Sequence, residues 1–251
     1  MMTAGGEFYS GTSNLVLPVK NKSYFPEAFR EQTRLSYYAS LFHSVEINSS
    51  FYRMPFARTV AKWASEVPDD FRFTFKLIQT VTHSVKRQFN TAPVAEFMER
   101  INAAGAKSGC LLVQLPPSFS VDLVQLHELL TLLTTTGGSH QWPLAIEFRH
   151  NSWYIDNMYE LLHKYNAAMV LHDMRISASP FELTSDQFVY LRFHGPESGY
   201  RGSYSDQYLQ EYASYIREWM EEGRAVYAYF NNTMGSAVQN LATLNDLVRN
   251  G

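Results

Sequence analysis

The sequence predicts an α/β protein, a single TIM-type (β/α)8 barrel that spans residues 1–251. Short apolar runs alternate with amphipathic helical stretches almost without interruption, which implies parallel strands joined by right-handed crossovers. A chain of 251 residues is also the usual size of one such barrel. The sequence has no G-x-G-x-x-G fingerprint after the first strand and no P-loop motif. We therefore expect a barrel rather than an open nucleotide-binding sheet.

Eight strands are expected, each a short run of aliphatic, β-branched or aromatic residues. They span 7–11, 44–48, 71–77, 110–115, 144–149, 167–173, 188–194 and 225–231. Helices are expected where apolar residues recur every three or four positions. These stripes span 60–67, 94–101, 123–133, 158–165, 209–219 and 238–248. After the sixth strand, an irregular excursion is expected at 176–187.

Composition excludes several classes of protein. The 21 Lys and Arg against 24 Asp and Glu give a net charge of −3, which disfavours a surface that coats nucleic acid or membrane but allows a local basic pocket. Cys110 is the single cysteine, so there is no internal disulfide framework and no Cys-rich zinc module. No apolar run approaches the ~18 residues of a membrane span, and the start MMTAGGEFYSGTS lacks the pattern of a secretion signal. We expect a cytoplasmic protein with no membrane partner; the sequence sets no oligomeric state.

Polar and apolar residues alternate along the expected strands. In the fifth strand, Leu144, Ile146 and Phe148 alternate with Glu147 and Arg149. The apolar face must pack against the helices, so the polar face should point into the barrel, near the strand ends where TIM-barrel sites lie. Unpaired burial of charge costs several kcal/mol, so these groups must pair, meet solvent or hold a ligand. The inward charged set is expected to be Glu46, Lys76, Glu147, Arg149, Asp173 and Arg192.

These charges allow several interpretations. Glu147 and Arg149 form either a stabilising charge ladder or part of a ligand site. Glu46 and Glu147 can be a carboxylate pair for acid–base chemistry, and Lys76 can be a nucleophile, a phosphate contact or the counter-ion of Glu46. Lys76, Arg149 and Arg192 together suit an anionic substrate, because arginine binds phosphate and carboxylate through two hydrogen bonds. We expect an anion near Arg149 and Arg192.

Histidines at strand ends supply the expected proton-transfer group. His194, followed by Gly195, is the candidate general base. His150 and His172 also fall at strand ends, so a metal site with the nearby carboxylates is an alternative, although no H-E-x-x-H or H-x-H motif supports it. No motif for an organic cofactor is visible, so we expect none, and a metal ion is the one possible exception.

Amides and aromatic residues complete the expected site. Asn48, Gln114 and Asn231 are expected to orient polar groups of the substrate. An aromatic wall is expected from residues in the loops after strands, namely Phe51, Tyr52, Trp153, Tyr200 and Tyr204. Trp63 and Trp219 lie on apolar helical stripes and are expected in the core.

Six segments stand out at the strand ends: VEINSSFYRMP, FRFTFK, LLVQLPPSF, AIEFRHNSW, YLRFHG and YAYFNN. With Tyr200 after the fifth of them, these segments resemble the DUF72, or YecE-like, family over about residues 11–247. The resemblance implies a TIM-like barrel and an uncharacterised bacterial or archaeal cytosolic protein, with no established reaction, substrate or cofactor. The shared motifs cover the expected catalytic residues Glu46, Lys76, Glu147 and His194. They also cover the expected binding residues Asn48, Tyr52, Gln114, Arg149, Trp153, Asp173, Arg192, Tyr200, Asn231 and Asn232.

The leading functional prediction is an enzyme of hydrolase or lyase type that acts on a small or nucleotide-like anionic substrate at the carboxyl-end mouth of the barrel. One alternative is a binding module for a phosphorylated or nucleic-acid ligand that is not turned over. Another is a metal-dependent phosphodiesterase, which rests on analogy with other barrels.

Overall fold

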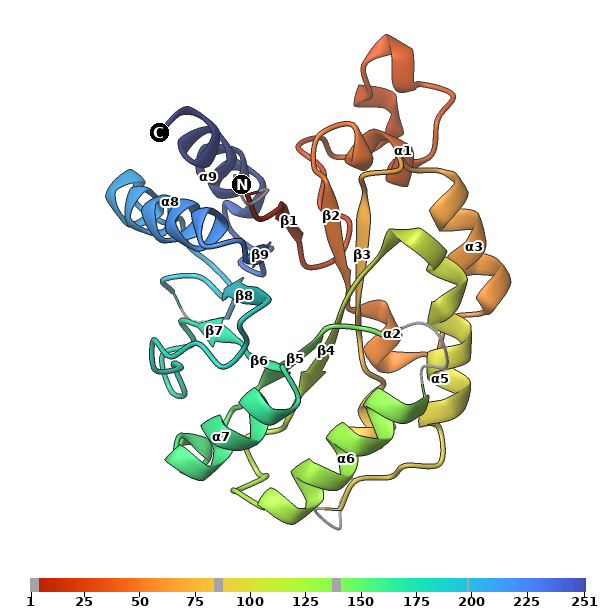
Figure 1. Cartoon of the computed structure of the whole chain (residues 1–251). Helices are drawn as coiled ribbons and strands as arrows, with labels where there is room; N and C mark the ends of the chain where they lie inside the picture. The colour runs from red at the N-terminus through yellow and green to blue at the C-terminus, as the bar shows by residue number, and fades with distance from the viewer. Residues whose placement is uncertain (1–4, 84–87, 137–140, 198) are drawn as a thin grey trace.

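The computed structural model describes residues 5–83, 88–136, 141–197 and 199–251, and its strands form two parallel sheets at the centre of the molecule (Figure 1). In spatial order, the first sheet contains β1 (Phe8–Thr12), β9 (Ala225–Phe230), β8 (Phe188–Phe193) and β7 (Leu171–His172). The second contains β2 (Ser44–Ile47), β3 (Arg72–Lys76), β4 (Ser108–Gln114), β5 (Leu144–Glu147) and β6 (Ala168–Met169).

The two sheets meet at both edges. At one edge, an isolated parallel bridge pairs Ser13, just after β1, with Glu46 of β2. At the other edge, β6 and β7 are consecutive pieces of one extended segment, of which β6 pairs with β5 and β7 pairs with β8. The strands therefore follow one another around a TIM-type barrel, which confirms the predicted fold class.

The sixth predicted strand needs a correction. One strand was expected at 167–173, but the structure has two short strands separated by Val170, whose amide donates to the Ile146 carbonyl. The chain changes its pairing partner at this point, from β5 to β8, and each of these strands pairs with only two of its residues. The expected excursion at 176–187 is confirmed, because these residues form no helix or strand.

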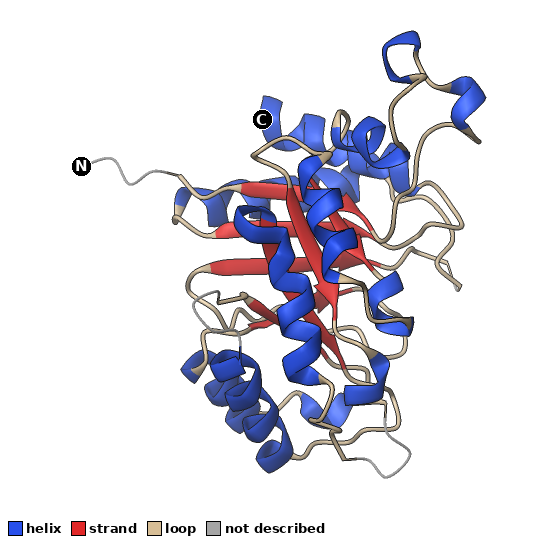
Figure 2. Cartoon of the chain, turned by 90° about the vertical axis from the view of Figure 1, so that its right-hand side faces the viewer, coloured by secondary structure: helices blue, strands red, loops and turns tan. Residues whose placement is uncertain are grey.

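Helices surround the strands on the outside (Figures 1 and 2). Each expected stripe forms a helix: α3 (Ala57–Ser65), α5 (Val94–Ile101), α6 (Leu123–Thr136), α7 (Asp156–Lys164), α8 (Asp206–Glu221) and α9 (Ala237–Asn250). Sequence periodicity missed three short helices, which are α1 (Arg34–Ala39), α2 (Ser49–Tyr52) and α4 (Gln79–Thr82). A helix of four to six residues completes too few turns to show a repeating stripe.

Two separate cores confirm the predicted inward and outward faces. The large outer core lies between strands and helices and includes Leu144, Ile146 and Phe148. A smaller inner core fills the barrel and includes Ala145, which alternates with them along β5. Trp219 lies in the outer core and Trp63 packs against it, as expected. Strand alternation therefore decides which side chains enter the barrel.

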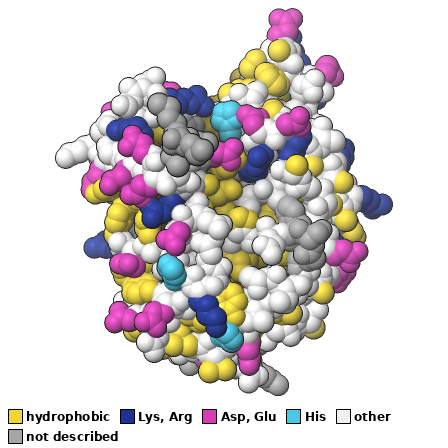
Figure 3. All heavy atoms as spheres, in the orientation of Figure 1, with side chains coloured by type: hydrophobic (Ala, Val, Ile, Leu, Met, Phe, Trp, Pro, Cys, Tyr) yellow, Lys and Arg dark blue, Asp and Glu magenta, His cyan; other side chains and the backbone are white. Residues whose placement is uncertain are grey.

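The segment between β1 and α1 projects from the body of the molecule in both views (Figures 1 and 2). It carries two single-turn helices, η1 (Lys22–Tyr24) and η2 (Glu27–Phe29). Acidic and basic side chains are interspersed over the face that Figure 3 displays. Within the described ranges, no helix combines the length and the apolar character that crossing a membrane requires.

Candidate functional site

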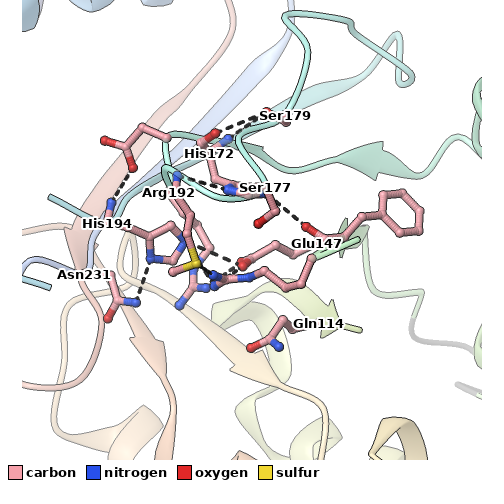
Figure 4. A network of polar contacts seen from close by, with 12 residues as sticks. Gln114, Glu147, His172, Ser177, Ser179, Arg192, His194 and Asn231 are labelled. Atoms are coloured by element: carbon pink, nitrogen blue, oxygen red, sulfur yellow. Dashed lines mark hydrogen bonds and ion pairs between the residues drawn. The ribbon is translucent and has the colours of Figure 1, made fainter. Parts of the chain in front are cut away.

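Charged and titratable side chains gather inside the barrel near the carboxyl ends of β2, β3, β5 and β8. We call six of them the mouth cluster: Glu46, Lys76, Glu147, Arg149, Arg192 and His194. Each is at most 9% exposed. The six residues come from the ends of four strands that lie far apart in the chain, since 71 residues separate Lys76 from Glu147. Figure 4 shows Glu147, Arg192 and His194 pointing toward one another. The structure thus brings together five of the six charged residues expected on inward faces, and His194 joins them in place of Asp173.

Arg192 is the centre of the cluster and has both glutamates as partners. Its Nε donates to Glu46 Oε2 at 3.0 Å and its Nη2 donates to Glu46 Oε1 at 2.7 Å. Its Nη1 donates to Glu147 Oε2 at 2.5 Å. With all three nitrogens engaged inside the protein, Arg192 has no free donor edge. The geometry therefore does not support the expectation that Arg192 holds an external anion.

Glu46 is fully satisfied as well. The hydroxyl of Ser13 donates to Oε1 at 2.6 Å and that of Tyr190 donates to Oε2 at 2.7 Å. Burial raises the pKa of Glu46, but Arg192 and these donors outweigh it and hold the pKa below its usual value. Burial likewise acts on Glu147, whose pKa Arg149 and Arg192 hold well below its usual value. Both carboxylates are ionised and paired, which favours a fixed charge network over a free acid–base pair.

Arg149 lies at the solvent edge of the same network. It forms an ion pair with Glu147 Oε1, contacts the Met174 sulfur, and places Nη2 at 3.2 Å from His194 Nε2. Its Nε has no hydrogen-bond partner among the described residues. The charge-ladder interpretation of Glu147 and Arg149 is thus confirmed, and the buried, unsatisfied Nε keeps the ligand-site interpretation open.

His194 is held in one orientation. The Asn231 side-chain amide lies 3.0 Å from Nδ1, and Glu147 Oε1 lies 3.5 Å from Nε2. Burial lowers the pKa of His194 to about 3, against the opposing effect of Glu147. The ring is therefore neutral near pH 7 and is a hydrogen-bond donor rather than an effective base.

Lys76 does not pair with a glutamate. Its Nζ donates to Gln114 Oε1 at 2.7 Å and lies 4.1 Å from the centre of the Phe51 ring. The counter-ion interpretation is wrong, because Arg192 occupies Glu46. Gln114 is half-buried and also donates to the Leu115 carbonyl at 3.3 Å. Lys76 is left as a nearly buried amine with a neutral acceptor.

A pocket of about 840 Å³ opens at the ends of β7 and β8. Polar side chains that line it include Asp173, Arg175, His194 and Ser203, and its apolar lining includes Ile176, Pro196, Tyr200, Tyr204 and Tyr208. Of the mouth cluster, only His194 is part of this lining. The pocket therefore lies to one side of the charged network rather than over its centre.

Asp173 connects the pocket to the strand ends. Its carboxylate accepts the His194 amide at 2.7 Å and the Tyr204 hydroxyl. Burial raises its pKa against these donors. The chain turns sharply after His194, where Gly195 has φ +103° and an added Cβ would lie 2.3 Å from the Arg201 carbonyl oxygen. Only glycine fits there, and the turn brings Tyr200 to a ring distance of 5.7 Å from His194.

Three expected binding residues lie elsewhere. Trp153 is fully buried in the outer core, where its ring stacks 4.8 Å from Phe148 and its Nε1 donates to the Phe119 carbonyl. Tyr52 is 72% exposed on α2. Asn232 is buried and donates to the Gly202 carbonyl and to the Asn240 side chain, so it stabilises the loop that contains Gly202. The expected aromatic wall is wrong for Trp153, which belongs to the single-turn helix η4 (Asn151–Trp153) that turns it outward.

Asn48 and two further histidines, His150 and His172, were also expected at the site. Asn48 is half-buried before α2, and its Oδ1 has no hydrogen-bond partner in the described part of the chain. His150 is exposed beside Ser152, and His172 Nε2 faces the Phe148 carbonyl at 3.0 Å. Among the described residues, no three His, Cys, Asp or Glu side chains form a group that could hold a metal ion. The expected histidine and carboxylate metal site thus lacks a donor set there.

Sequence reasoning missed three contributors. Ser13 and Tyr190 bind Glu46, and Tyr204 binds Asp173 rather than only lining a wall. Position gave a signal for the first two, since Ser13 follows the first strand and Tyr190 shares the inward face of Arg192. Nothing in the spacing of Tyr204 indicated its carboxylate partner.

Comparison with known proteins identifies the relatives of this barrel. The family described as "Protein of unknown function DUF72" matches residues 9–251. The chain belongs to the DUF72 family. This confirms the resemblance that the strand-end motifs carry, and the family description assigns no reaction.

Individual proteins match over more than half of the chain. UPF0759 protein YunF of Bacillus subtilis is 25% identical over 243 residues, which cover 85% of each chain. UPF0759 protein YecE of Escherichia coli K12 is 29% identical over 148 residues, or 57% of this chain and 53% of its own length. A solved DUF72 family protein from Enterococcus faecalis V583 has a TM-score of 0.77 at 21% identity, and the match covers 97% of this chain and 96% of that one. This last likeness supports the fold.

Proposed function

We propose that this DUF72 protein is an enzyme of lyase or hydrolase type that acts on a small anionic substrate at the carboxyl-end mouth of its barrel. The observation that carries the proposal is Arg149, a nearly buried guanidinium at the rim of the network whose Nε has no hydrogen-bond partner among the described residues. A buried charged donor left unsatisfied costs free energy, and an incoming oxyanion recovers it.

The charge balance of the cluster supports an anionic substrate. Arg149, Arg192 and Lys76 are three cations, whereas Glu46 and Glu147 are two carboxylates and both contact arginine. One positive charge is thus in excess among these five groups. The two cations nearest to solvent, Arg149 and Lys76, are each 9% exposed. A carboxylate or phosphate that reaches Arg149 would restore the balance.

The pocket supplies space and groups for chemistry next to this cation. His194 lines the pocket and lies 3.2 Å from Arg149 Nη2. Neutral His194 suits hydrogen bonding to the substrate, whereas Asp173, with its raised pKa, is better suited to exchange a proton. Asn231 positions the His194 ring. The proposed chemistry needs no metal ion, and we also propose that the protein acts in the cytoplasm, where its single cysteine stays reduced.

Calorimetric titration tests the anion site. We expect inorganic phosphate, pyruvate or a short oligonucleotide to bind, and binding to weaken as salt rises. Arg149→Met should weaken it about tenfold or more, equivalent to ~1.4 kcal/mol. Arg30→Met removes an exposed arginine of the projecting segment and is the matched control, with unchanged affinity expected. If the wild-type protein binds none of the three anions, the proposal falls.

Turnover is tested separately, with the anions that bind. Nuclear magnetic resonance of the mixture should show a new product from the bound compound, and Arg149→Met should slow its formation. If anions bind through Arg149 and no product forms from any of them, the enzyme part of the proposal is overturned and the protein is a binding module.

A further inference from the structure

Lys76 is the one member of the mouth cluster whose charge is left without an opposite partner nearby. Among the described residues, no carboxylate oxygen lies within 4 Å of its Nζ, because the arginines engage both glutamates. Its contacts are the Gln114 carbonyl oxygen at 2.7 Å and the face of Phe51 at 4.1 Å. A neutral oxygen and an aromatic ring position the amine without fixing its charge.

The surroundings of Lys76 favour the neutral amine more than water does. Burial, together with the positive charge of Arg192, lowers its pKa to about 8 against the opposing effects of Glu147 and Glu46. An amine that is partly neutral near pH 7 has a free electron pair on nitrogen, which an exposed lysine lacks. Lysines desolvated in this way attack carbonyl carbon.

We propose that Lys76 forms an imine with a small carbonyl compound that carries an anionic group, such as an oxo acid or a phosphorylated aldehyde. This inference rests on the proposed function, because Arg149 supplies the contact to the anion. The chain of contacts from Lys76 to the anion site is short. Lys76 binds Gln114, Gln114 is the register partner of Glu147, and Glu147 pairs with Arg149.

The reaction balances without an oxidant or reductant. The Nζ electron pair forms a bond to the carbonyl carbon, the C=O π pair moves to oxygen, and a proton transfer yields the carbinolamine. Nitrogen then expels the protonated oxygen as water and becomes an iminium ion. The iminium withdraws electrons from the neighbouring carbon. There a C–H bond releases its proton to water, or a C–C bond releases its fragment as a carbonyl compound, and the bonding pair is stored as the enamine. Protonation and attack of water on the iminium carbon release the product and return Nζ.

Reductive trapping tests the proposal on the full chain. The protein is incubated with cyanoborohydride and one of three probes: pyruvate, glyceraldehyde 3-phosphate or uncharged acetaldehyde. We expect one adduct per chain with the anionic probes, and peptide mapping of the wild-type protein should locate it at Lys76. Mapping needs no variant, so a folding defect cannot hide the result. Lys76→Met should lose the adduct, and Lys62→Met, which removes an exposed lysine, should retain it.

The second part of the experiment tests the contact between Arg149 and the anionic group of the probe. Arg149→Met should reduce trapping of pyruvate about tenfold and leave trapping of acetaldehyde unchanged, because only the first probe has a carboxylate for the guanidinium. Adducts spread over exposed lysines, or none at Lys76 although pyruvate binds in calorimetry, overturn this inference and leave the proposed anion site standing. Equal trapping of all three probes at Lys76 supports the nucleophile and overturns the anion requirement of the proposed function.

Discussion

The interior of the barrel handles buried polar groups in two different ways. Within the strands lies a group that we call the tyrosine layer: Tyr9, Tyr190, Tyr227 and Tyr229. Its rings pack on one another, with centroids 5.0 Å apart for Tyr9 and Tyr227 and 5.3 Å apart for Tyr190 and Tyr229. Burial raises the pKa of each phenol, so the layer carries no charge near pH 7. The mouth cluster, nearer the strand ends, carries full charges on its glutamates and arginines.

The difference lies in how completely each group satisfies itself. The Tyr229 hydroxyl contacts both Ser44 at 2.6 Å and Thr74 at 2.8 Å. In the mouth cluster, the Glu46–Arg192 side is equally complete, whereas Arg149 and Lys76 have incomplete polar contacts. In TIM barrels the amino-end layers supply stability and the carboxyl-end residues supply chemistry. Here the boundary between these roles runs through the cluster itself, between Arg192 and Arg149.

The largest expected effect concerns Arg192, whose polar contacts are complete. Arg192→Met leaves two buried carboxylates without their main partner, and we expect a loss of about 3–5 kcal/mol in unfolding free energy. The reason is that Arg192 forms ion pairs with both Glu46 and Glu147. Urea unfolding measures the loss. Arg149→Met is the comparison, and we expect a smaller loss of unfolding free energy because Glu147 retains Arg192 as a partner. Equal losses in the two variants would contradict the proposed difference between Arg192 and Arg149.

A smaller effect is expected where the two groups touch. Tyr190 belongs to the tyrosine layer and donates to Glu46 at 2.7 Å. Tyr190→Phe keeps the ring and removes a hydrogen bond to a charged acceptor, so we expect a loss of about 1.5–3 kcal/mol in unfolding free energy. Tyr229→Phe, which removes only neutral contacts, should lose about 1 kcal/mol. If both variants lose the same unfolding free energy, the charge of Glu46 does not strengthen its hydrogen bond with Tyr190.

The smallest expected effect concerns Lys76, one of the two cations with incomplete polar contacts, and its titration with pH. With a pKa of about 8, its neutral fraction should rise from about one tenth at pH 7 to about nine tenths at pH 9. The pKa is lowered by burial, so lowering the pH charges the amine and reduces its reactivity. The charged or titratable groups that act on it lie on β2, β5 and β8 or directly after α4 and β5: Glu46, His83, Glu147, Arg149 and Arg192.

Labelling with an acetylating reagent, read by mass spectrometry, measures this titration. The rate at Lys76 should rise about tenfold between pH 7 and pH 9 with a midpoint near 8. The exposed Lys62 in the same sample corrects for loss of reagent. A Lys76 rate that is flat over this range would contradict the lowered pKa and weaken its role as a nucleophile.

The sequence alone determined most of the strands, the faces of their side chains and most of the helices. Glu147 and Arg149 enter the barrel and Ile146 does not, because side chains alternate along any strand and the helices require the apolar face. Helices of eight residues or more were predictable from their stripes, as in α5 and α8. This information is local, so a single sequence carries it.

Only the tertiary structure decided which partners these side chains take. Arg192 meets Glu46 across 146 residues and Glu147 across 45, and no spacing rule links such positions. The same holds for Trp153, which packs into the outer core after a single helical turn, and for Lys76, which loses its expected counter-ion to Arg192. Pairing of buried charges depends on distance and desolvation inside the closed fold, and these exist only after the strands have been brought together.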